Sequence, residues 1–150
     1  METAKNISAA INNLIMKNND THQKYLDLAF ETKTITLRGL LRKLAEKRRI
    51  FSMQLAVGLK DFDISSEVDY DGSLMGALER GWLNLKTSIS METDESLLAE
   101  CVSAETATLE EYENTIKQEG LSEKLVTVLQ QHMEETEASL RKLHSIEDLS

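Results

Sequence analysis

The sequence predicts an all-α protein, a bundle of four long helices with one long crossover between the second and the third. Apolar residues recur at steps of three and four along four segments, which indicates helices with one buried face. The chain contains no proline, a residue that interrupts long helices. Aromatic residues make up only 5%, which suits an aliphatic bundle core better than a β-sandwich. Because 150 residues are enough for one hydrophobic core, we expect residues 1–150 to form a single domain.

The first two helices are expected to be joined by a tight link. The first covers about 4–31, and the second runs from an N-cap at Thr34 to about Phe62. Gly39 and Gly58 each weaken the second helix by about 1 kcal/mol relative to alanine, and they are positions where a neighbouring helix could approach closely. The two apolar stripes are Ile7, Ile11, Leu14, Ile15, Tyr25, Leu28 and Ala29, then Leu37, Leu40, Leu41, Leu44, Phe51, Leu55, Leu59 and Phe62.

A long crossover, about 63–93, separates the second and third helices. Its first part is acidic and short of apolar residues, whereas 74–89 is expected to form a short extra helix with Trp82 on its apolar face. A crossover of this length lets the third helix run parallel to the second, which is the connectivity of ferritin-like bundles. Trp82 is expected either to cover one side of the bundle or to anchor a dimer contact.

The last two helices have clear start and stop signals. Thr93 is followed by two acidic residues, which favour a helix N-terminus, and the third helix is predicted to end at about Glu119, before Gly120. Ser122 is the predicted N-cap of the fourth helix. The tight link between these helices makes them antiparallel neighbours.

The charge of the chain is unevenly distributed. The net charge is −9, but residues 1–90 carry 13 Lys/Arg against 11 Asp/Glu, whereas residues 91–150 carry 4 against 15. An acidic surface argues against nucleic acid as a partner, because phosphate binding needs a basic stripe. No apolar run approaches the roughly 20 residues that span a bilayer, so no membrane partner is expected. The N-terminus does not resemble a signal peptide, and the single cysteine, Cys101, permits no internal disulfide. We therefore expect a cytoplasmic protein.

Polar residues interrupt the apolar stripe of each long helix near its middle. A buried charge is costly unless it is paired, so Arg48 and Glu105 are predicted to form an ion pair in the bundle centre. A guanidinium fork suits a carboxylate, and neighbouring ring and phenol groups could add hydrogen bonds. The predicted polar layer comprises Asn18, His22, Arg48, Glu105, Tyr112 and His132.

A metal site is the alternative interpretation of this layer. Di-iron bundles use Glu-x-x-His motifs, and none occurs here; the nearest arrangement is His132 followed by Glu135, in the reverse order. A cation at Arg48 would also repel a metal. No cofactor is therefore expected, with iron, manganese and zinc left open, and any such site would use His22, Glu105, His132 and Glu135.

The stretch 72–86, Gly-Ser-Leu-Met-Gly-Ala-Leu-Glu-Arg-Gly-Trp-Leu-Asn-Leu-Lys, resembles the crossover motif of a bacterial family of unknown function with a ferritin-like bundle. The pattern at 44–51 and Glu105 followed by Tyr112 are also similar to that family. The resemblance implies a ferritin- or rubrerythrin-like topology with an incomplete set of metal ligands and no established activity. It places Glu105 where a third-helix carboxylate ligand lies, and Arg48 where a ligand histidine could lie.

The leading functional hypothesis is a non-enzymatic bundle that acts through a protein partner or self-association, as in a dimer, with a role in stress adaptation. No catalytic residue is predicted. The alternative is a metal-binding or redox ferritin-like protein with a degenerate carboxylate/histidine site. A small-molecule carrier with a pocket between helices is the third hypothesis, and the sequence does not indicate its ligand.

Overall fold

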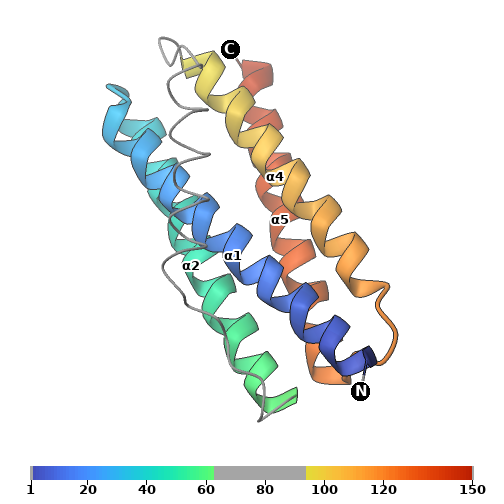
Figure 1. Cartoon of the computed structure of the whole chain (residues 1–150). Coiled ribbons are helices and arrows are strands. Elements are labelled where there is room, and N and C mark those ends of the chain that lie inside the picture. Colours follow the sequence, from blue (N-terminus) through green and yellow to red (C-terminus); the bar gives the residue numbers. More distant parts are fainter. Residues whose placement is uncertain (1, 63–93, 150) are drawn as a thin grey trace.

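The computed structural model of the chain describes residues 2–62 and 94–149, and these form four long helices (Figure 1). They are α1 (Glu2–Glu31), α2 (Ile35–Phe62), α4 (Asp94–Ile116) and α5 (Glu123–Leu149). No strand occurs among the described residues, so the prediction of an all-α four-helix bundle is confirmed. The predicted extra helix at 74–89 and the packing of Trp82 lie outside the described residues. None of the described helices combines the length and the apolar character needed to cross a membrane.

The four helices are arranged as a square in which α2 and α4 lie on a diagonal. The side pairs are α1 with α2, α4 with α5, α2 with α5, and α1 with α4. The Thr34 hydroxyl donates a 2.7 Å hydrogen bond to Asp94 Oδ2, which joins the start of α2 to the start of α4. These two helices are therefore parallel, and α2 ends at the opposite end of the bundle from the start of α4 (Figure 1). This is the arrangement that a long crossover was predicted to produce.

The link between α1 and α2 is held by Arg38. Its guanidinium donates to the carbonyls of Ala29 at 3.2 Å and Thr32 at 2.7 Å, which satisfies carbonyls left free at the end of α1. The carbonyl of Thr34 accepts the first hydrogen bond of α2, from the Arg38 amide at 2.9 Å, as expected of an N-cap residue. Its hydroxyl donates to Asp94 instead of accepting from the helix, so this residue also joins two helices.

The link between α4 and α5 begins earlier than predicted. The prediction that the third helix ends at about Glu119 was wrong, because α4 ends at Ile116. A tighter bond from the Gln118 amide to the Thr115 carbonyl, 3.1 Å, closes the last turn, and Gly120 has a positive φ of 85°. The predicted N-cap at Ser122 is confirmed, since its hydroxyl accepts from the Leu125 amide at 3.2 Å.

The hydrophobic core consists of two apolar clusters, one toward each end of the bundle. One cluster lies toward the α1–α2 link and contains Tyr25, Leu28, Ala29, Leu37, Leu41, Leu44, Ala45, Leu97, Leu98, Cys101 and Leu143. The other lies toward the α4–α5 link and contains Ile7, Ile11, Leu14, Ile15, Leu55, Ala56, Leu59, Tyr112, Leu125 and Leu129. Buried polar residues of all four helices, among them Asn18, Arg48, Glu105 and His132, lie between the two clusters.

The two glycines of α2 should respond differently to substitution by alanine. At Gly39 an added Cβ meets nothing within 4 Å, so Gly39→Ala is expected to raise the free energy of unfolding by about 1 kcal/mol. At Gly58 the Cβ would lie 3.0 Å from Leu125 Cδ2, so the crowding offsets the gain in helix propensity. Urea unfolding of both variants measures the difference, and equal gains would show that α2 and α5 do not depend on close approach at Gly58.

Candidate functional site

A buried ion pair lies at the centre of the bundle. Arg48 of α2 and Glu105 of α4 are each 1% exposed, and Arg48 Nη2 contacts Glu105 Oε2. The pair therefore bridges the diagonal of the bundle. The phenol of Tyr25 on α1 donates a further hydrogen bond to the same carboxylate oxygen, at 3.1 Å. Burial lowers the pKa of Arg48, and the nearby phenols of Tyr25 and Tyr112 oppose this effect.

Asn18 of α1 connects the ion pair to the aromatic residues of the layer. Arg48 Nη1 donates to Asn18 Oδ1 at 3.0 Å. Because a guanidinium only donates hydrogen bonds, the carbonyl oxygen of the Asn18 amide must face Arg48 and its NH₂ must face away. That NH₂ group donates to the phenol oxygen of Tyr112 at 2.9 Å and to the Leu14 carbonyl at 3.0 Å.

The same reasoning fixes the tautomer of His132 on α5. The Tyr112 phenol accepts from Asn18, so its own hydrogen is available to His132 Nδ1, 2.8 Å away. Nδ1 is then the acceptor, and Nε2 carries the hydrogen that is donated to Gln54 Oε1 at 2.7 Å. The hydrogen bonds thus run in one direction from Arg48 to Gln54, and they involve all four helices.

His132 is held in its neutral form. Its ring is 0% exposed and stacks on Phe51 with a centroid distance of 3.9 Å and an interplanar angle of 12°. Burial, together with the charge of Arg48, lowers the pKa of His132 to about 3. Burial also raises the pKa values of Tyr25 and Tyr112, so both phenols keep the hydrogen that the network requires.

The carboxylate of Glu105 is not fully satisfied. Its Oε2 takes both the Arg48 contact and the Tyr25 hydrogen bond, whereas Oε1 is buried without a hydrogen-bond partner. An unpartnered buried oxygen costs free energy, since it has lost its hydration without replacement. The pair therefore contributes less to stability than its full burial suggests.

Two residues of the predicted layer or metal set lie outside this network. His22 is half-buried, and its Nδ1 lies 2.7 Å from the Ala45 carbonyl. Glu135 is also half-buried and lines a surface groove between α2 and α5 beside Gln54. Sequence reasoning missed the roles of Tyr25 and Gln54. The position of Tyr25, a phenol on an apolar stripe, could have indicated a hydrogen-bonding role in the layer. Gln54 is exposed, and no sequence pattern indicated such a role for it.

The side chains of the polar layer are engaged with one another instead of being open to a metal ion. Both ring nitrogens of His132 are engaged, and the Arg48 cation lies against the carboxylate of Glu105. Within residues 2–62 and 94–149, no group of three or more His, Cys, Asp or Glu side chains is placed to hold a metal. The thiol of Cys101 is 0% exposed, and burial raises its pKa to about 12, so it is not a ready ligand or nucleophile.

Comparison with known proteins connects this architecture to one family. Residues 6–118 match a family described as a domain of unknown function, DUF2383. The chain belongs to the DUF2383 family. No curated protein and no solved structure matches the chain. The matched part of this DUF2383 protein includes Asn18, Tyr25, Arg48, Glu105 and Tyr112, and it ends before α5, the helix that adds His132.

Removing the guanidinium should destabilise this DUF2383 protein strongly. Arg48→Met leaves Glu105 as an uncompensated buried charge, with an expected loss of about 3–5 kcal/mol in the free energy of unfolding. Arg48→Met combined with Glu105→Leu should recover most of that loss, because the second change removes the stranded carboxylate. The exposed Arg42→Met is the matched control, with an expected effect within about 0.5 kcal/mol. An Arg48→Met protein as stable as the wild type in urea would show that the ion pair is not the centre of the layer.

His132 should make stability depend on pH. Its pKa falls from 6.5 when unfolded to about 3 when folded, so the unfolded state binds the proton more readily. The stabilisation is complete above pH 6.5 and is lost as pH falls toward 3, by at most about 1.4 kcal/mol per pH unit. Unfolding of wild type and His132→Gln between pH 7 and 4 measures this, and the variant should lose less stability on acidification. His144→Gln, which removes an exposed histidine from the same helix, is the control for the loss of an imidazole. Parallel curves for all three proteins would refute the assignment.

Proposed function

We propose that this protein is a non-enzymatic bundle that acts through protein contacts, in which the outer face of α2 binds the acidic face of a second copy. The observation that carries the proposal is an exposed apolar stripe on a basic helix. Ile50, Met53 and Val57 are 40%, 55% and 57% exposed, and their spacing places them on one side of α2. Apolar side chains gathered on a charged surface are typical of protein interfaces.

Charge identifies the complementary surface. The α2 segment contains seven Lys/Arg against two Asp/Glu, whereas α4 contains seven Asp/Glu and no Lys or Arg. Because α2 and α4 lie on the diagonal, their outer faces are on opposite sides of the bundle. A symmetric contact of α2 with α2 would bring like charges together, so α2 of one copy is matched to α4 of the next. Such a contact is heterologous and adds copies as concentration rises, unless a ring closes.

We also propose that the bundle is ferritin-like. Antiparallel α1 and α2, antiparallel α4 and α5, and parallel α2 and α4 support this topology. The metal-binding alternative gains no support from the geometry. The polar groups of the layer hydrogen-bond one another, and Arg48 lies where a metal would have to approach Glu105. The buried layer supports a structural role instead.

Self-association should depend on both the apolar stripe and the charges. Sedimentation velocity is expected to show larger species as protein concentration rises, and these should dissociate in 1 M salt, where screening shortens to about 3 Å. Met53→Glu with Val57→Glu should weaken association at least about tenfold. Phe30→Glu is the matched control, because Phe30 is 89% exposed on α1, away from the stripe.

Charge exchange makes the test specific for the helices. Arg42→Glu with Lys60→Glu places negative charges on α2, and Glu110→Lys with Glu113→Lys places positive charges on α4; all four residues are exposed. Neither double variant should associate alone, whereas a mixture of the two should. A wild-type protein that stays monomeric at every concentration would overturn the proposed second copy.

A further inference from the structure

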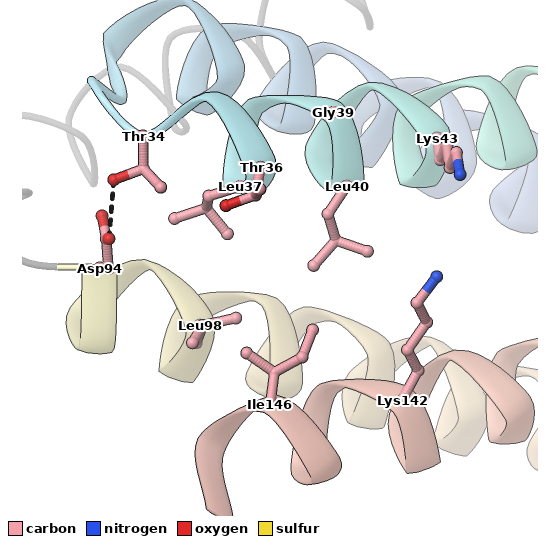
Figure 2. Close-up of a pocket in the computed structure, with 10 residues that line it drawn as sticks. All are labelled: Thr34, Thr36, Leu37, Gly39, Leu40, Lys43, Asp94, Leu98, Lys142 and Ile146. Atoms are coloured by element: carbon pink, nitrogen blue, oxygen red, sulfur yellow. Dashed lines mark hydrogen bonds between the residues drawn. The ribbon is translucent and has the colours of Figure 1, made fainter. Parts of the chain in front are cut away.

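A cavity of about 420 Å³ lies where the starts of α2 and α4 meet the C-terminal part of α5 (Figure 2). Its volume falls within the range of about 300–1,000 Å³ that is typical of small-molecule sites. It lies at the end of the bundle marked by the Thr34–Asp94 hydrogen bond, beyond the buried polar network. The exposed apolar residues proposed for the self-contact between α2 and α4 do not line this cavity. The inference therefore does not depend on that proposal.

The walls of this cavity are mainly apolar. Leu40 of α2, Leu98 of α4 and Ile146 of α5 point into the space between the helices (Figure 2). Gly39 widens the cavity on the α2 side, since a Cβ added there would meet nothing within 4 Å. These features form a slot suited to an apolar chain, bounded by described residues of α2, α4 and α5.

Charges of opposite sign lie at the two ends of the slot. The Asp94 carboxylate accepts the Thr34 hydrogen bond at one end, and Lys43 and Lys142 lie at the other, where Lys142 extends toward α2 (Figure 2). Neither lysine has a hydrogen bond or an ion pair within the part of the chain that the structure describes. Two cations that have no ion pair among the described residues and share the mouth of an apolar cavity, in a protein of net charge −9, favour an anionic group between them.

We propose that this cavity binds a free single-chain amphipathic anion, a medium-chain carboxylate. The carboxylate lies between Lys43 and Lys142, and the chain extends along Leu40, Leu98 and Ile146 toward Asp94. The repulsion from Asp94 sets this orientation, because an anionic head at that end would face a carboxylate. The apolar contacts supply affinity, and the two lysines select an anion over a neutral or cationic head.

Isothermal titration with sodium decanoate tests the proposal on the wild-type protein. Decanoate should bind with one molecule per chain, whereas decyltrimethylammonium, which has the same chain and a cationic head, should bind at least about tenfold more weakly. No saturable decanoate binding, or equal binding of the two amphiphiles, would overturn the proposal.

Two kinds of variant locate the site without depending on a disrupted fold. An added Cβ at Gly39 meets nothing within 4 Å, and leucine improves helix propensity, so Gly39→Leu is expected to keep or raise Tm while its side chain blocks the cavity and abolishes decanoate binding. Lys43→Gln and Lys142→Gln should each weaken binding about tenfold. Lys5→Gln, an exposed lysine near the start of α1 at the other end of the bundle, is the matched control and should bind as the wild type does. Undiminished binding by Gly39→Leu would place decanoate elsewhere.

A sedimentation assay separates a free carboxylate from a lipid headgroup as the source of this chemistry. With vesicles of phosphatidylglycerol at physiological salt, the protein should remain in the supernatant, because the cavity takes one isolated chain. Sedimentation of the protein with the vesicles, lost in Lys43→Gln with Lys142→Gln, would assign the two lysines to a membrane surface and overturn the free-anion proposal.

Discussion

The arrangement of the buried layer depends on one chemical property of Arg48, a guanidinium that only donates hydrogen bonds. Because it is buried at the centre of the bundle, each of its hydrogen-bond partners must present an acceptor. Glu105 does so as a carboxylate and Asn18 as an amide carbonyl. The orientation of Asn18 then decides which way the Tyr112 hydroxyl points, and this in turn decides which nitrogen of His132 carries hydrogen. One donor thus determines the protonation and orientation of groups on all four helices.

The buried polar layer determines the axial register of the helices more than it adds to the stability of the fold. A buried ion pair is a weak source of stability, and the unpartnered Oε1 of Glu105 lowers its contribution further. A slip of one helix by a single turn, about 5.4 Å, would nevertheless strand Arg48 or Glu105 against an apolar cluster. The aliphatic clusters at either end would tolerate such a slip far better, because Leu and Ile side chains pack without directional bonds. We therefore interpret the polar layer as the element that aligns the helices.

Periodicity in the sequence predicted which faces of the helices are buried, and it identified Arg48 and Glu105 as residues that need a partner. It could not predict the position of each helix along the bundle axis relative to its neighbours. Asn18 and His22 are one turn apart on the same face, and only the axial offset of α1 from α2 decides that Asn18 meets Arg48 while His22 meets a backbone carbonyl. Gln54 was missed for a related reason, since an exposed amide gives no pattern. The end of α4 was misplaced because a tighter final turn precedes Gly120.

The region where this protein could bind a ligand depends on how many of its buried polar groups already have bonding partners. A ligand or metal needs a group with free bonding capacity, and the two atoms of the layer without a hydrogen-bond partner, Glu105 Oε1 and Arg48 Nη2, belong to the ion pair and are closed off from solvent. The surface retains far more capacity. Basic α2 and acidic α4 lie on the diagonal of the bundle, where Arg48 and Glu105 pair in the interior but the outer faces of the two helices lie on opposite sides of the molecule. Among the described residues, Lys43 at the cavity mouth has no hydrogen bond or ion pair. An interior whose polar groups mostly bond one another, together with charged outer faces, supports the two proposals that place binding outside the buried layer.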